Sequence, residues 1–141
     1  MRYLLDTDTC IQIIRHRPEH LLARLFSVAP GDAGISSITA AELAYGVHKS
    51  RDRERNARAL EEFLLPIPVM GFDDQAAAAY GQVRAALEAL GQPIGSMDML
   101  IGAHALALST TLVTNNVREF SQISGLQVEN WWAPDAHDER T

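Results

Sequence analysis

The chain has 141 residues, 47% of them hydrophobic and 21% charged, which suits one globular domain with its own core. Its 12 basic and 18 acidic side chains give a net charge of −6, so bulk positive charge does not explain any binding to nucleic acid. The sequence contains no apolar run of about 18 residues and no pattern typical of a signal peptide. Because Cys10 is the single cysteine, no intrachain disulfide is possible. We therefore expect a cytoplasmic protein that does not contact a membrane.

Short apolar runs alternate with helical patterns along the chain. The predicted strands are residues 2–5, 33–36, PIPVM (66–70), TTLVT (110–114) and GLQVENW (125–131). The predicted helices cover residues 9–15, 18–26, 39–50, 53–65, 74–90 and 97–108, the last with Ser96 as its N-cap. Strands separated by helices indicate a parallel sheet with helices on both faces.

The stretch DTDT (6–9) comes directly after the first predicted strand, and Thr114 and Asn116 follow the fourth. In parallel sheets the carboxyl ends of the strands carry the site, so these polar residues stand where a site is expected. Asp6 alone fits three roles: a helix N-cap, the nucleophile of a haloacid-dehalogenase-type phosphohydrolase, or a metal ligand. The phosphohydrolase pattern is incomplete, because the only lysine, Lys49, precedes every later strand.

Three further acids stand at the ends of predicted elements. Glu42 comes three residues after Thr39, a spacing that predicts a capping box. Asp98 lies in the first turn of an almost entirely apolar helix, where it interacts favourably with the helix dipole or serves a site. Glu119 follows Asn116 by three residues and is either a surface acid or a member of the same site.

Other reactive or charged side chains fit more ordinary roles. His104 lies within the apolar helix and is expected in the core, because no second His or Cys stands at a zinc-ligand spacing. Cys10 is expected to be a small core residue. Arg51, Arg55 and Arg58 are predicted to share one helical face, which either is solvated or contacts phosphates or an acidic partner.

Taken together, five segments resemble the PIN-domain ribonuclease family, most closely its VapC toxin branch of type II toxin–antitoxin systems. These segments are YLLDTDTCI (3–11), ISSITAAELAYG (35–46), PIGSMDMLIGAHA (93–105), TLVTNNVREF (111–120) and GLQVENW (125–131). The resemblance implies a single PIN domain over residues 1–132, followed by a polar tail, 133–141. It implies an α/β/α sandwich around a mostly parallel sheet of four to five strands.

The resemblance also implies a site. Asp6, Glu42 and Asp98 would bind one Mg²⁺ or Mn²⁺ ion and would be catalytic together with Asn116 and Glu119. Thr7 and Thr114 would support them, and Asp8 stands where many relatives have Asn. Such a site suits phosphodiester cleavage, because a hard cation takes oxygen ligands and makes water more acidic.

The partners implied by the resemblance are a VapB-type antitoxin, a second copy of the chain, and RNA. In this branch the RNA is commonly the anticodon loop of initiator tRNA, and DNA is contacted only through the antitoxin. Arg51, Arg55 and Arg58 would contact the RNA or the antitoxin. The main alternative is a PIN-like module that binds a partner without catalysis.

Overall fold

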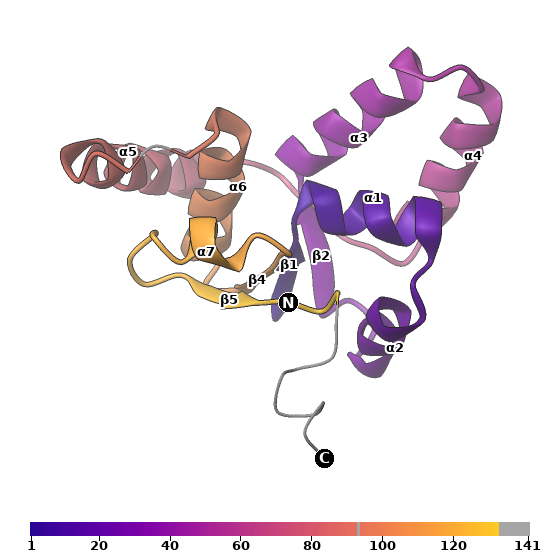
Figure 1. Cartoon of the computed structure of the whole chain (residues 1–141), viewed down its shortest axis with the longest axis horizontal. Coiled ribbons are helices and arrows are strands. Elements are labelled where there is room, and N and C mark those ends of the chain that lie inside the picture. Colours follow the sequence, from indigo (N-terminus) through magenta and orange to yellow (C-terminus); the bar gives the residue numbers. More distant parts are fainter. Residues whose placement is uncertain (93, 133–141) are drawn as a thin grey trace.

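The computed structural model describes residues 1–92 and 94–132, so the predicted tail lies outside the described residues. Five strands and seven helices alternate over this part of the chain (Figure 1). The strands are β1 (Tyr3–Leu5), β2 (Ala33–Ser36), β3 (Val69–Met70), β4 (Thr111–Val113) and β5 (Gln127–Glu129). The helices are α1 (Thr7–His16), α2 (Glu19–Ser27), α3 (Ser37–Lys49), α4 (Arg53–Leu64), α5 (Asp74–Ala89), α6 (Ser96–Ala107) and α7 (Val117–Phe120).

The strands form one sheet in the order β3-β2-β1-β4-β5, and every neighbouring pair is parallel. The chain builds outward from β1 to β3 on one side and then returns to place β4 and β5 on the other. The order therefore reverses between β1 and β4, where the backbone N–H of Asp6 donates to the carbonyl of Val113 over 3.0 Å. A reversal of this kind leaves a crevice at the carboxyl ends of the two strands.

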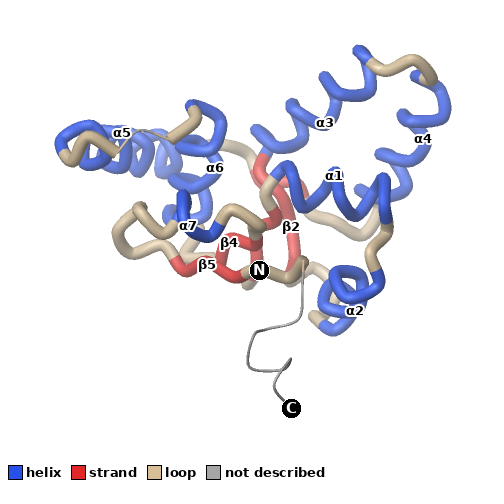
Figure 2. The backbone as a smooth tube through the Cα atoms, in the orientation of Figure 1, coloured by secondary structure: helices blue, strands red, loops and turns tan. Residues whose placement is uncertain are grey.

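Alternating side chains of the strands separate the core into two halves. Tyr3 and Leu5 pack with residues of α1, α2 and α4, whereas Leu4 packs with residues of α5, α6 and α7. In Figure 2 the strands accordingly run through the centre, with α1–α4 on one side and α5–α7 on the other. The predicted α/β/α sandwich with a parallel sheet is confirmed, as are the buried positions of Cys10 and His104.

Three local predictions are wrong. Ser36, rather than Thr39, caps α3, because its hydroxyl accepts the backbone N–H of Ile38 over 3.0 Å. The predicted capping box is therefore absent, and Glu42 lies in the second turn of α3, with its side chain free for another role. Gly95 is the N-cap of α6 in place of Ser96. The short helix α7 follows β4 in a stretch for which we predicted no helix.

The predicted common face of Arg51, Arg55 and Arg58 is also wrong in part. Asp52 caps α4 by accepting the backbone N–H of Arg55 over 3.2 Å, so the helix begins at Arg53. Arg51 consequently lies in the loop between α3 and α4, while Arg55 and Arg58 lie on the helix. Among residues 1–92 and 94–132, no helix is long and apolar enough to cross a membrane.

Candidate active site

Asp6 lies at the carboxyl end of β1 and is also the N-cap of α1. Its Oδ1 accepts the backbone N–H of Thr9 over 2.9 Å, and the residue is only 4% exposed. Burial raises the pKa of Asp6 above its ordinary value, although hydrogen bonds from Thr114 and Thr9 oppose the shift. Asp6 is thus a cap in geometry, but a buried carboxylate at the reversal point of the sheet is also well placed to meet a ligand.

Glu42 is brought to the site by a contact between α1 and α3. The hydroxyl of Thr7 donates to Oε1 of Glu42 over 2.6 Å and lies 3.2 Å from the hydroxyl of Thr39. Thr7 directly follows Asp6, so this bond orients the Glu42 carboxylate beside the first turn of α1. The predicted supporting role of Thr7 therefore has a structural basis.

Asp98 is half-buried in the first turn of α6, and its pKa is raised to about 6. Burial is the largest cause, followed by the negative charges of Glu119, Asp6, Asp8 and Glu42, in that order. The charges of four carboxylates thus all act on a fifth that is half-buried, where water screens them less than at the open surface. The acids singled out from the sequence therefore converge on one region, although they come from α1, α3, α6 and α7.

Glu119 joins the loop after β4 to the start of α6. Its Oε1 accepts the backbone N–H of Gly95 over 3.3 Å, and its Oε2 accepts a hydrogen bond from the side-chain amide of Asn116. Asn116 is itself held by its backbone N–H, which donates to the hydroxyl of Thr114 over 2.9 Å. Both oxygens of Glu119 thus have protein partners, and this chain of bonds fixes the N-terminal end of α6, where Asp98 lies.

The donor set of this region suits a hard divalent cation. Its charged groups are all carboxylates, and a cation would favour the ionised form of Asp98, which burial and then the neighbouring negative charges disfavour. In the part of the chain that the structure describes, no three acidic, His or Cys side chains are close enough together to enclose an ion. Mg²⁺ does not require such a cage, because it commonly binds one or two carboxylates and keeps several waters. The residues therefore fit the predicted cation.

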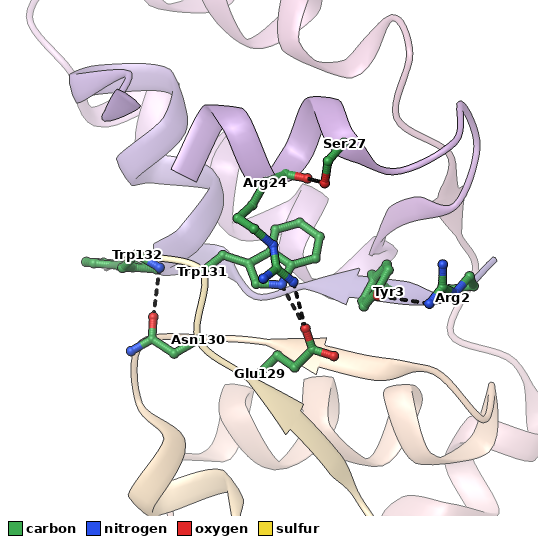
Figure 3. A network of polar contacts seen from close by, with 8 residues as sticks. All are labelled: Arg2, Tyr3, Arg24, Ser27, Glu129, Asn130, Trp131 and Trp132. Atoms are coloured by element: carbon green, nitrogen blue, oxygen red, sulfur yellow. Dashed lines mark hydrogen bonds and ion pairs between the residues drawn. The ribbon is translucent and has the colours of Figure 1, made fainter. Parts of the chain in front are cut away.

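The segment after β5 contacts Thr9, the residue whose backbone N–H donates to Asp6. The indole N–H of Trp132 donates over 3.0 Å to the hydroxyl of Thr9, which lies 3.3 Å from the carbonyl of Val113. The neighbouring Trp131 donates instead to Glu129, which also forms an ion pair with Arg24 of α2 at 3.0 Å (Figure 3). Sequence reasoning did not identify Trp132. Its only sequence signal is an aromatic residue directly after the predicted strand 125–131.

His104 connects two elements that carry site residues. It is 1% exposed, and its Nδ1 lies 2.8 Å from the hydroxyl of Ser36, the N-cap of α3. The ring and the hydroxyl form one hydrogen bond, whose direction is set by the tautomer of the imidazole. The bond thus ties α6, which carries Asp98, to the start of α3, which carries Glu42.

An apolar groove lies beside Glu42, between α1, α3 and α4. The side chains of Ile11, Leu43, Val47 and Leu60 line it, together with Glu42 itself. The basic residues of α4 and the preceding loop lie further along. Arg51, Arg55 and Arg58 are exposed, and none of them pairs with an acid among the described residues.

Comparison with known proteins agrees with this arrangement. The family model described as PIN domain matches residues 3–126. The tRNA(fMet)-specific endonuclease VapC of Salmonella typhimurium is 43% identical over 131 residues, which cover 93% of this chain and 98% of that protein. The crystal structure of VapBC2 from Rickettsia felis bound to a DNA fragment from its promoter matches with a TM-score of 0.89 and 41% identity. That match covers 93% of this chain and 99% of the other.

A second solved structure, DNA-bound VapBC from Salmonella typhimurium, also matches with a TM-score of 0.89, at 43% identity, covering 93% of this chain and 98% of the other. The range 3–126 that the family model matches contains Asp98 and the four acids whose charges act on it. The five-stranded parallel sheet, the carboxylates at its reversal point and these matches along nearly the whole chain lead to one conclusion: the chain belongs to the PIN-domain family, in its VapC group.

Proposed function

We propose that this chain is a metal-dependent endoribonuclease toxin that cleaves tRNA and is neutralised by a VapB-type antitoxin. The observation that carries the proposal is the convergence of acids on Asp98 at the crevice between β1 and β4. The proteins it resembles support the substrate, because the Salmonella relative is named as specific for tRNA(fMet). We therefore favour initiator tRNA, cut in its anticodon loop.

In this proposal Asp6, Glu42 and Asp98 share one Mg²⁺ or Mn²⁺ ion, which one or two of them would bind directly and the others through water. A bound divalent cation would supply the positive charge that offsets charge developing on a phosphate, and it would make water more acidic. Thr7 holds the Glu42 carboxylate in place through its 2.6 Å bond. Asn116 and Glu119 hold the N-terminal end of α6, and so position Asp98.

Because the chain is acidic, the RNA backbone needs contacts with basic groups outside the site in addition to the cation at the acids. Asp6, Asp8, Glu42, Asp98 and Glu119 repel phosphates when no cation is present. Exposed arginines suit the outer part of a binding surface, because guanidinium groups bind phosphates in a bidentate manner. We assign Arg51, Arg55 and Arg58 to contacts with RNA or with the antitoxin.

The groove beside Glu42 suits the antitoxin. Its apolar lining of Ile11, Leu43, Val47 and Leu60 would bury hydrophobic side chains, and Glu42 at its edge would attract a cation from the same segment. A segment seated there would block the site directly. The solved VapBC structures with DNA support a complex in which DNA is reached through the antitoxin. We also propose that the chain works as a homodimer in the cytoplasm.

The experiment is incubation of the purified protein with initiator tRNA and with an elongator tRNA, in Mg²⁺, Mn²⁺ or EDTA. We expect a discrete cut in the initiator tRNA that requires the metal and that disappears when the antitoxin is added. Cutting that persists in EDTA would refute the metal mechanism. Binding of tRNA with no cut in either metal would favour the non-catalytic module.

A further inference from the structure

Tyr45 is an aromatic side chain on α3 that the fold does not use. It is 66% exposed, and Nζ of Lys49 lies 5.2 Å from the centroid of its ring. The ring is therefore open to solvent on most of its surface and has a cation beside it. An exposed hydrophobic residue alone needs no explanation. The feature that calls for an explanation is the position of this ring close to the acids of the site.

Helical spacing places Tyr45 on the same line of side chains as a site acid. Ile38, Glu42, Tyr45 and Lys49 are separated by four, three and four residues, so they form one stripe along α3. Ile38, at the inner end, packs against the half of the core that contains Met99 and Ile101 of α6. The stripe therefore begins at the junction of α3 with α6, passes through Glu42, and reaches Tyr45 one turn further from the sheet.

The surroundings of Tyr45 differ from those of Phe26 and Leu90, two other strongly exposed hydrophobic residues. Phe26 is 72% exposed but lies on α2, and Leu90 is 67% exposed but follows α5. Neither shares a helical stripe with any of the acids that converge on Asp98. Tyr45 alone among these three combines a free ring, an adjacent ammonium group and a site carboxylate one helical turn away.

We propose that Tyr45 stacks on an unpaired base of the RNA bound at the Asp6, Glu42 and Asp98 site, with Lys49 contacting a neighbouring phosphate. This inference rests on the proposed ribonuclease function and identifies the substrate as single-stranded at the position that Tyr45 contacts. Bases in loops can be splayed out and stacked on aromatic side chains, whereas bases within an RNA duplex cannot. The cation next to the ring suits the phosphate that accompanies each stacked base.

The test measures binding of fluorescein-labelled oligo(A) and oligo(U) RNA in Mg²⁺ to the full chain with its site carboxylates intact, and a gel run after each measurement shows that the RNA remains uncut. Tyr45→Ala should weaken binding by roughly 5-fold to more than 100-fold, the loss expected when one stacked base is released, and more for oligo(A) than for oligo(U). Tyr45→Phe should bind like the parent, because it keeps the ring. Lys49→Gln should reduce the salt dependence of binding by about 0.7 in log–log slope, the value for one phosphate on a single strand.

Phe26→Ala is the matched control, since it removes an equally exposed ring from α2 and should leave binding unchanged. Equal affinity of Tyr45→Ala and its parent would overturn the proposal, and so would the absence of any RNA binding by the parent. A change in oligomeric state of Tyr45→Ala, measured by gel filtration, would also overturn the proposal, because the ring would then belong to an interface between copies of the chain. Cleavage by the wild-type chain is assayed separately, so a failure of the ribonuclease function is distinguished from a failure of the Tyr45 assignment.

Discussion

The two aspartates at the centre of the site are held in different ways. Asp6 uses Oδ1 to cap α1, so a substitution there removes a cap bond as well as a charge. Asp98 accepts no cap bond in α6, where Gly95 is the N-cap. A change at Asp98 therefore reports on the charge cluster more cleanly than a change at Asp6.

We predict that Asp98→Asn stabilises the metal-free protein at neutral pH. The raised pKa of about 6 means that the folded state binds the Asp98 proton more tightly than the unfolded state does. Ionised Asp98 therefore destabilises the fold above that pKa, and protonation removes this effect as the pH falls through about 6 toward 4. In EDTA, the thermal midpoint of the variant should exceed that of wild type at pH 7.5, and the two should approach each other at pH 4.5.

A midpoint for Asp98→Asn that is lower than wild type at pH 7.5, with the difference independent of pH, would contradict this prediction. It would mean that Asp98 acts only as a favourable partner of the helix dipole. Asp98→Asn should also abolish RNA cleavage, because it removes one carboxylate from the proposed cation site.

The sequence identified the site acids better than it identified their local partners. Asp6, Glu42, Asp98 and Glu119 stand near the ends of predicted elements, and the resemblance to PIN domains placed them in one site; in the structure the charges of the other three all act on Asp98. The role of Thr7 as the donor to Glu42 was expected only from resemblance, since it depends on how α1 packs on α3. The Thr39 capping box failed because Ser36 supplies the same kind of cap three residues earlier, and pattern alone does not rank two hydroxyls.

At the scale of elements, the site depends on contacts between segments far apart in the chain. The His104–Ser36 bond joins α6 to α3, and the Glu119–Gly95 bond joins α7 to α6. The order of strands and helices was predictable, because alternating apolar runs and helical periods are local signals. Helix α7 has only four residues, which is too short to produce a periodic pattern, so the sequence gives no signal from which to predict it. The long-range bonds had no sequence signal at all.

We predict that Trp132→Phe impairs cleavage more than Trp131→Phe, although it costs less stability. Both changes keep an aromatic ring and remove one indole N–H donor, a loss of about 1 kcal/mol for an ordinary hydrogen bond. Trp131 is 1% exposed and packs at 4.9 Å between ring centroids against Tyr3, so its replacement disturbs the core more. Only Trp132 donates to Thr9, whose backbone holds Asp6.

Thermal unfolding and RNA cleavage by the two variants, measured side by side, provide the comparison. If Trp131→Phe had both the lower thermal midpoint and the slower RNA cleavage, the loss of activity would reflect stability alone. The bond from Trp132 to Thr9 would then have no specific effect on Asp6.

At the scale of the whole molecule, an acidic chain must bind a polyanion. Its formal net charge is −6, and the charges of Glu119, Asp6, Asp8 and Glu42 all act on Asp98. Affinity for RNA must therefore come from a cation at the acids together with local basic groups, and it should depend strongly on ionic strength.

We predict that replacing Arg51, Arg55 and Arg58 together with Gln weakens binding of RNA at low salt and makes the binding less dependent on salt. Each lost phosphate contact should lower the log–log slope by about 0.7 for single-stranded RNA. Replacing Arg84, which pairs with Glu88 at 2.8 Å on α5, provides a control with the same kind of charge change at a site remote from α4. Unchanged affinity and slope in the triple variant would show that these arginines only solvate the surface, or that they serve the antitoxin alone.

The central claim is that Asp6, Glu42 and Asp98 form one site for a divalent cation. The most direct measurement is the rise in thermal midpoint as Mg²⁺ or Mn²⁺ is added to wild type, Asp98→Asn and the control Glu88→Gln, whose carboxylate lies on the surface of α5. A ligand that binds only the folded state stabilises it by an amount that grows with the logarithm of its concentration once that concentration exceeds the Kd. We predict a midpoint that rises with the logarithm of the metal concentration in wild type and Glu88→Gln, a rise that is largely lost in Asp98→Asn. An equal rise in all three proteins, or none in wild type, would contradict the account.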